Sequence, residues 1–139
     1  MLRLLIGAFL LIHGLISAAQ VPAILGGGEP SENPSWMSWW PTPLGRSWLL
    51  APLGLENTPI SWLFGILWVV AGICFLASGV GIFAHQEWWQ AAAAAGALIS
   101  LVVLAVYFHP WYAFAVLLNA GILLALWWAH WPPTNTVGS

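Results

Sequence analysis

The sequence predicts an all-α, polytopic membrane protein in which four transmembrane helices form an up-down-up-down bundle, with residues 1–139 as one transmembrane domain. Apolar residues make up 61% of the chain and charged residues only 4%, whereas soluble domains carry about 25% charge. Four segments hold about 20 mostly apolar residues each, the length that crosses the hydrocarbon core of a bilayer. The last three segments follow one another through short connections, which favour antiparallel neighbours.

The first predicted span covers residues 4–25. Its start, Met1-Leu2-Arg3, and the small residues Ser17-Ala18-Ala19 also resemble a secretory signal with a cleavage site. The apolar stretch continues to Leu25, however, beyond the usual length of a signal's apolar region. We therefore expect a retained transmembrane helix.

The other three spans are predicted at residues 61–83, 88–108 and 111–131, and all should be helical because lipid offers no partner to backbone polar groups. Pro110 suits a first helical turn, where no backbone N–H is needed. Small residues should mark close helix contacts: Gly7, Gly14 and Ala18 share one face of the first span, and Gly72 and Gly79 share one face of the second.

The loop at residues 26–60 is the exception among the connections. It contains six prolines, three acidic residues and four tryptophans. Structureless loops of this length are uncommon and usually functional.

The charges give a slight orientation signal. Arg3 lies at one end of the bundle and Arg46 in the long loop with three acidic residues. The positive-inside rule then places both termini in the cytoplasm and the long loop outside.

Twelve tryptophans are concentrated near the predicted helix ends. Such positions suit amphipathic rings at the headgroup level. The predicted anchoring or docking positions at helix ends are Trp88, Trp89, Trp127, Trp128 and Trp131. Trp36, Trp39 and Trp40 are spaced i, i+3, i+4, which predicts a short helix with its rings pointing inward. It would serve either as a cap or docking surface or as a membrane anchor.

The composition excludes several classes of function. Six charged side chains cannot cover a water-facing surface, and two cations cannot form a nucleic-acid groove. Cys74 is the only cysteine, so no internal disulfide or thiolate zinc site is possible. No span contains an acidic or basic side chain in its hydrocarbon part, which argues against a proton-coupled multidrug-type antiporter. The scarcity of cations argues against a glutathione-transferring membrane enzyme.

Each predicted span has a polar or soft residue near its midpoint. His13, Ser17 and Gln20 form one stripe on the first span, and we expect His13 to face Asn119 or Ser100 inside the bundle. One interpretation is a set of interhelical hydrogen bonds. The other is a pocket for a quinone or a lipid headgroup. The full predicted layer is His13, Ser17, Gln20, Cys74, Ser78, Ser100 and Asn119.

Metal and cofactor chemistry has little support in the sequence, and no cofactor is predicted. His85 and His130 are predicted on the same side of the membrane, where two imidazoles could ligate one b-type haem. An interfacial histidine without a ligand is the simpler interpretation. Ser17 lies one turn from His13, but no carboxylate is available to complete a catalytic triad.

The order Arg3-x3-Gly7-x5-His13-Gly14-Leu15 resembles the start of small four-helix bacterial membrane proteins of the DoxX-like kind. Three later stretches are similar to a related, uncharacterised group of bacterial membrane proteins: Ser47 to Leu50, Leu67 to Ala71 and Trp127 to Pro132. The resemblance implies a four-helix bundle. The broader family includes a subunit of a thiosulfate:quinone oxidoreductase, which implies redox or quinone association.

The first functional hypothesis is a non-catalytic accessory subunit, bound to lipid and to a larger respiratory or photosynthetic membrane complex. The second is a DoxX-like quinone- or redox-associated protein, with His13 and Asn119 lining the site. A small transporter or a lipid-binding bundle, acting as a homo-oligomer, ranks third, because polar residues are confined to the midplane.

Overall fold

A computed structural model describes residues 1–20 and 32–133. Its long helices are α1 (Leu2–Ala19), α3 (Pro59–Phe83) and α4 (Trp89–Val106). The fourth span combines the 3₁₀ turn η2 (Pro110–Tyr112), α5 (Ala113–Leu123) and the π-helical turn η3 (Leu124–Trp128). All four spans are long and apolar enough to cross a membrane. The predicted all-α membrane fold is confirmed.

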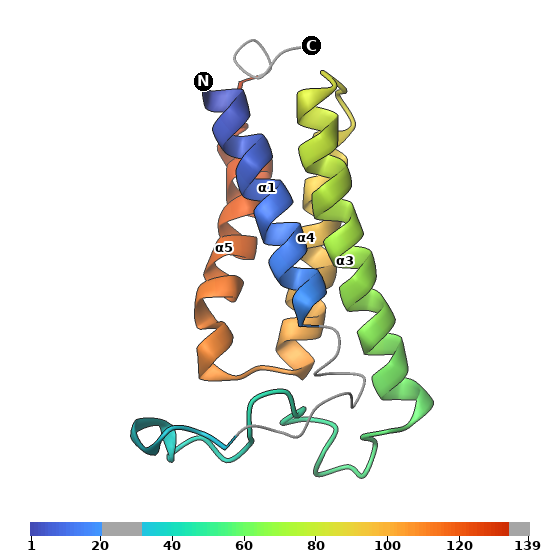
Figure 1. Cartoon of the computed structure of the whole chain (residues 1–139), viewed down its shortest axis with the longest axis vertical. Helices are drawn as coiled ribbons and strands as arrows, with labels where there is room; N and C mark the ends of the chain where they lie inside the picture. The colour runs from blue at the N-terminus through green and yellow to red at the C-terminus, as the bar shows by residue number, and fades with distance from the viewer. Residues whose placement is uncertain (21–31, 134–139) are drawn as a thin grey trace.

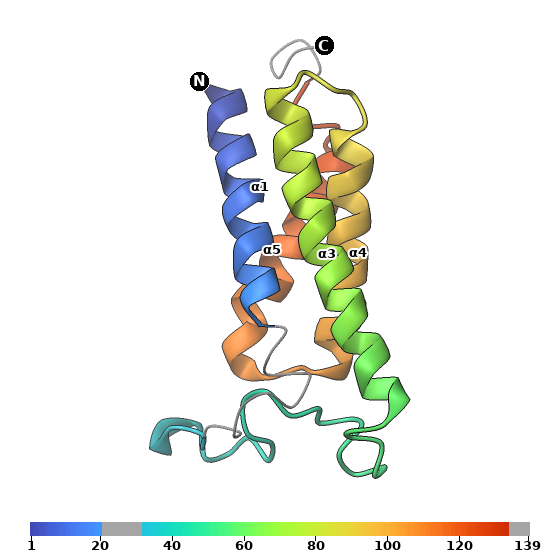
Figure 2. The same cartoon turned by 45° about the vertical axis from the view of Figure 1, so that its right-hand side comes forward.

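The long helices lie side by side with their axes nearly parallel to one direction (Figures 1 and 2). The amino end of α1, the α3–α4 turn and the carboxyl end of the fourth span share one end of the bundle. The opposite end carries the α4–α5 connection and residues 32–58 of the long loop, here called the cap. The short helical turn η1 (Ser35–Met37) belongs to the cap.

The helix boundaries differ from the prediction by at most three residues where both can be compared. The helix α3 begins at Pro59, because the Thr58 side-chain oxygen accepts a hydrogen bond from the Ile60 N–H at 3.3 Å. The helix α1 ends at Ala19, and the predicted continuation over residues 21–25 lies outside the described residues. Residues 26–31 of the predicted loop also lie outside them.

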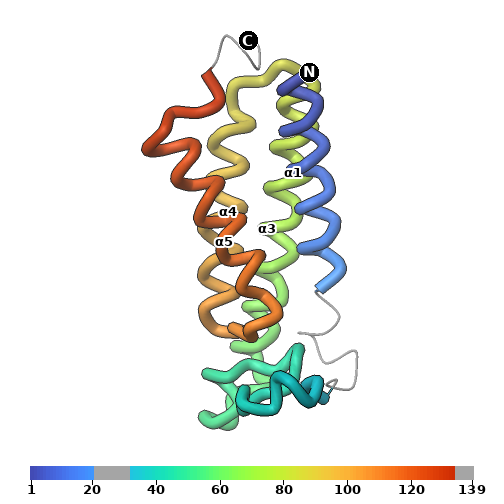
Figure 3. The backbone as a smooth tube through the Cα atoms, turned by 90° about the vertical axis from the view of Figure 1, so that its left-hand side faces the viewer, coloured from blue at the N-terminus to red at the C-terminus, as the bar shows by residue number. Residues whose placement is uncertain are grey.

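The fourth span, predicted at 111–131, is helical from Pro110 to Trp128 but is not α-helical throughout. An α-helical register holds only from Ala113 to Leu123, and the chain then widens into the π-helical turn that ends at Trp128. Figure 3 shows this carboxyl end swinging away from the other helices. Such a π turn changes the direction in which the following side chains point.

Glycine permits the close contact between α1 and α3. A β-carbon on Gly14 would lie 3.0 Å from the Gly72 carbonyl oxygen, and one on Gly79 would lie 3.0 Å from that of Gly7. These positions confirm the predicted glycine faces. Because lipid provides no hydrophobic driving force between helices, such close backbone approach is a main source of helix association in a bilayer.

The seam between α3 and α4 has a different composition. Phe75 and Ala97 are fully buried there, and a β-carbon on Gly81 would lie 3.0 Å from that of Trp89. The prediction of Trp89 as an interfacial anchor is therefore wrong: its ring is buried in the apolar core. Gly81 leaves space for the β-carbon of Trp89 and for the ring of Trp88, two atoms of which would lie 3.1 Å from an added β-carbon.

Candidate functional site

Three helices meet in a buried polar layer, here called the midplane layer, formed by His13, Asn119 and Ser100. The ring Nε2 of His13 lies 3.4 Å from Asn119 Oδ1, and Asn119 Nδ2 donates to Ser100 Oγ at 3.2 Å. All three residues are buried. The structure thus places His13 against Asn119, as the sequence predicts, and adds Ser100 through the asparagine.

The hydrogen-bond pattern fixes the orientation of the Asn119 amide and the tautomer of the His13 ring. Asn119 Nδ2 also donates to the Ala115 carbonyl oxygen at 2.8 Å, so both hydrogens of the amide are used. Its Oδ1 must then accept, which assigns the proton of neutral His13 to Nε2. The imidazole is held between two aromatic rings, at centroid distances of 5.7 Å to Phe9 and 4.6 Å to Phe75.

The other four predicted members do not join this layer. The Ser17 hydroxyl donates to the His13 carbonyl oxygen in its own helix, and the Ser78 hydroxyl donates to the Trp89 carbonyl oxygen. Gln20 accepts from the Tyr112 hydroxyl at 3.2 Å, nearer the cap. Cys74 is half-buried in the seam between α3 and α4. These residues lie at similar depths in their predicted spans. Their side chains are nevertheless not in contact, because they lie on different faces of their helices.

Replacing Asn119 with leucine should lower the free energy of unfolding by about 2 kcal/mol, since two interhelical hydrogen bonds of about 0.6–2 kcal/mol each are lost. Ser100→Ala should cost about half as much, because the bond to His13 survives. The measurement is unfolding by SDS titration in detergent micelles. An Asn119→Leu protein as stable as the wild type would show that the layer does not hold the helices together.

A second polar cluster joins the cap to the end of α4. The Ser47 hydroxyl donates to the Val106 carbonyl oxygen at 2.7 Å, and the Trp48 indole N–H donates to that of Ala105 at 2.9 Å. The last carbonyls of a helix have no partner within it. The cap supplies these partners, and thereby closes this end of α4.

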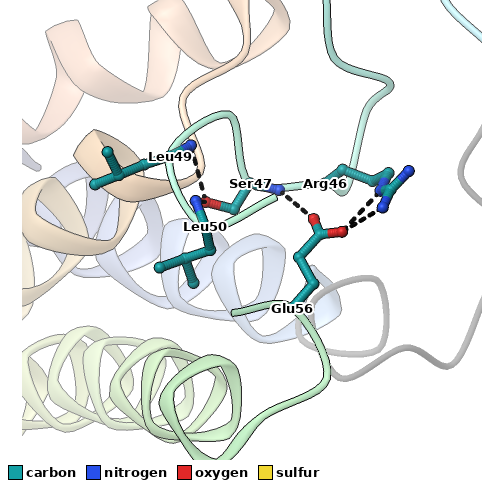
Figure 4. Close-up of polar contacts among 5 residues, drawn as sticks. All are labelled: Arg46, Ser47, Leu49, Leu50 and Glu56. Atoms are coloured by element: carbon teal, nitrogen blue, oxygen red, sulfur yellow. Dashed lines mark hydrogen bonds and ion pairs between the residues drawn. The ribbon is translucent and has the colours of Figure 1, made fainter. Parts of the chain in front are cut away.

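The same cluster orders the cap itself (Figure 4). Ser47 Oγ accepts from the Leu50 N–H at 2.9 Å, and the Ser47 N–H donates to Glu56 Oε1 at 3.1 Å. The other carboxylate oxygen of Glu56 accepts from the Arg46 guanidinium in an ion pair. Leu50 is buried against the bundle beside Trp68. Ser47 is thus the point at which the turn, the ion pair and α4 meet.

His109 fastens the other half of the cap. Its Nδ1 accepts from the Trp111 N–H at 3.2 Å, so the proton is on Nε2, which donates to Asn33 Oδ1 at 3.0 Å. Asn33 Nδ2 donates in turn to the carbonyl oxygens of Trp40 and Thr42. No sequence motif predicts a role for this histidine. Its position directly before Pro110, where a side chain can cap the first helical turn, is the signal that could have identified it.

Acidification should loosen the cap through His109. Burial lowers the pKa of this imidazole below its ordinary value of 6.5. The unfolded state therefore binds more protons, so this contribution to stability is present above pH 6.5 and is lost as the pH falls below it. A protonated Nδ1 would also face the Trp111 N–H as a second donor.

Hydrogen–deuterium exchange of residues 33–44 at pH 7.5 and pH 5, corrected for the intrinsic rate, measures this effect. The wild type should exchange faster at the lower pH. His109→Gln should show the same exchange at both, because glutamine does not titrate. Equal protection of the wild-type cap at both pH values would refute the role of His109.

The three clustered cap tryptophans do not share one face, contrary to the prediction. Trp36 and Trp39 are 63% and 67% exposed, whereas Trp40 is half-buried against Phe108 at a ring-centroid distance of 5.5 Å. Only a single 3₁₀ turn forms, and Met37 is its buried residue. The structure places the remaining predicted anchoring rings on the surface: Trp88, Trp127, Trp128 and Trp131.

The histidines predicted as possible haem ligands lie in turns. His85 and His130 both adopt positive φ, at 57° and 47°. The ring of His85 contacts the Arg3 guanidinium, which joins α1 to the α3–α4 turn. Among the described residues, no group of three or more His, Cys, Asp or Glu side chains is arranged to hold a metal ion.

The chemistry of these sites is structural in character. The Ser17 hydroxyl donates to a backbone carbonyl and not to the His13 ring, so no nucleophile–base pair is assembled there. The buried indole N–H of Trp68 has no hydrogen-bond partner among the described residues. The midplane layer connects three helices, and the cap closes one end of the bundle.

No protein-family model, curated protein or solved structure matches this chain.

Proposed function

We propose that this chain is a non-catalytic accessory subunit of the bacterial inner membrane, which packs against a larger membrane complex of the respiratory or photosynthetic kind. The observation that carries the proposal is the high solvent exposure of the side chains of the fourth span. Only 11% of its residues are buried, compared with 44% in α3 and in α4. The bundle therefore leaves most of the surface of this helix available for a partner.

The outer face of this helix has the shape that favours helix packing in lipid. Phe114 and Leu117 are 70% and 69% exposed, and Leu124 and Trp128 continue the same face. Gly121 lies in the middle of it, and a β-carbon there would meet nothing within 4 Å. A partner helix could approach the backbone closely at this glycine.

The charges support an orientation with both termini in the cytoplasm. Arg3 lies near the amino terminus, at the end of the bundle that also holds the α3–α4 turn. Arg46 lies in the cap at the opposite end, where Glu56 neutralises it. The positive-inside rule counts arginines near span ends, and the cytoplasmic side then carries Arg3.

Purification from native membranes in mild detergent tests the proposal. The wild type should co-elute with a larger complex in fixed stoichiometry. Gly121→Leu should lose this complex, because the leucine side chain would occupy the space that the glycine leaves on the surface of the helix. Ile73→Leu, at a position 57% exposed on α3, is the matched control and should retain the complex. Recovery of the wild type alone would count against a subunit role.

A DoxX-like quinone- or redox-associated function is the second candidate. It is favoured by His13, whose Nδ1 has no hydrogen-bond partner among the described residues. A quinol hydroxyl could donate to this nitrogen. Quinone extracted from the purified wild type and absent from His13→Leu would support this function; its absence from both would remove it.

A further inference from the structure

A groove of about 290 Å³ lies between α1, α4 and the fourth span, on the side of the midplane layer away from the cap. Its wall on α1 runs from Leu2 to Leu10, all before His13 in the chain. Its wall on the fourth span begins at Ile122, one turn after Asn119. The His13–Asn119 contact therefore closes its inner end.

The sequence explains why these helices leave a space. Ala93 of α4 and Ala125 of the fourth span contribute small side chains to the walls. Ala125 also belongs to the π-helical turn, where the chain swings away from α1 (Figure 3). The groove thus forms because two wall positions carry small alanine side chains and because the helix changes from α to π.

The chemistry of the walls restricts what can fill the groove. The lining side chains are apolar apart from the indole N–H groups of Trp89 and Trp131, so water would find few polar partners there. Residues 134–139, Thr-Asn-Thr-Val-Gly-Ser, are mostly polar and unsuited to such a lining. A helix of about 10–12 Å diameter needs far more room, whereas the volume is close to the smallest sites for small molecules, about 300 Å³.

We propose that the groove binds one acyl chain of a membrane phospholipid. The lining residues belong to the membrane-spanning helices or directly follow them, so the groove is reached from the hydrocarbon layer. Its outer end is at Leu2 and Trp131, next to the terminal amino group and Arg3. Arg3 contacts the ring of His85, and no acidic side chain among the described residues forms an ion pair with it. The positive charge of Arg3 favours a phosphodiester headgroup over the uncharged head of a quinone.

Two pairs of variants test the proposal by native mass spectrometry of protein released from detergent. Ala125→Trp fills the groove, and Ala113→Trp places the same side chain elsewhere on the fourth span. Leu5→Trp fills it from α1, and Leu4→Trp is its control; these leucines are 59% and 58% exposed, so neither change should unfold the chain.

The wild type and both controls should retain one phospholipid per chain, and both filling variants should lose it. Retention by the filling variants, absence from the wild type, or a retained isoprenoid quinone would each overturn the proposal. The partner test is separate: Gly121→Leu should keep the phospholipid, and Ala125→Trp should keep the partner complex. Loss of the complex from Ala125→Trp with the lipid retained would assign the groove to a protein contact.

Discussion

Replacing Gly14 with leucine should separate α1 from α3 and lower the free energy of unfolding by about 3 kcal/mol, the upper end of the usual cost of overpacking. The reason is that the new side chain would meet backbone atoms of α3 as well as the side chain of Leu76. A β-carbon at this position already lies 3.0 Å from the Gly72 carbonyl oxygen and from the Leu76 nitrogen. The two helices can accommodate it only by moving apart along the whole seam.

SDS titration of the purified protein in micelles measures the effect. Gly121→Leu is a matched control, because it is the same substitution in a helix and its β-carbon would meet nothing within 4 Å. It should unfold at the same SDS fraction as the wild type. A Gly14→Leu protein with wild-type stability would show that α1 and α3 are not held at the observed separation.

Replacing Ser47 with alanine should release the cap from α4. The hydroxyl serves the Val106 carbonyl oxygen and the Leu50 N–H at once, and its residue is fully buried. An unsatisfied buried polar group costs about 1–3 kcal/mol. The loss of both bonds should therefore lower the free energy of cap opening by about 2–3 kcal/mol, while the helices beneath remain packed.

Hydrogen–deuterium exchange separates these two consequences. Residues 44–58 should lose protection in Ser47→Ala, whereas the midpoints of α3 and α4 should keep it. Ser38→Ala, at an exposed position in the same cap, should change neither. Unchanged protection around residue 47 would mean that the apolar contact of Leu50 alone holds the cap in place.

The elements that follow from periodicity and length were predictable from the sequence. Lipid requires continuous helices, so apolar segments of sufficient length identify the four spans within a few residues. Glycine faces identify the α1–α3 seam, since few other residues permit such close approach. The pairing of His13 with Asn119 followed from their depth and from the cost of an unpaired polar group in lipid.

The cap could not be predicted, because its contacts join residues that no local period relates. Ser47 contacts Val106 across 59 positions, and Asn33 contacts His109 across 76. A serine or an asparagine in a proline-rich loop gives no indication of the residue to which it will hydrogen-bond. Depth alone also misassigned Ser78, whose hydroxyl donates to a carbonyl oxygen of α4 instead of joining the midplane layer. Depth specifies a level in the membrane but not the face of the helix.

The departure of the fourth span from a regular α-helix could not be predicted from the sequence either. A π turn depends on how the chain packs against its neighbours, and the sequence around Ala125 has an ordinary helical composition. This turn contributes Ala125 to the wall of the apolar groove. The exposed face around Leu117, in contrast, lies in the regular α-helix before the turn.

Photo-crosslinking in native membranes tests the subunit role most directly. A photoreactive amino acid replaces Leu117, in the middle of the exposed face, or Ile73, equally apolar and exposed on α3. We expect one discrete, larger product from position 117 and none from position 73, with the same partner protein in every preparation. Lipid adducts alone from position 117, or the same products from both positions, would contradict a protein interface on the fourth span.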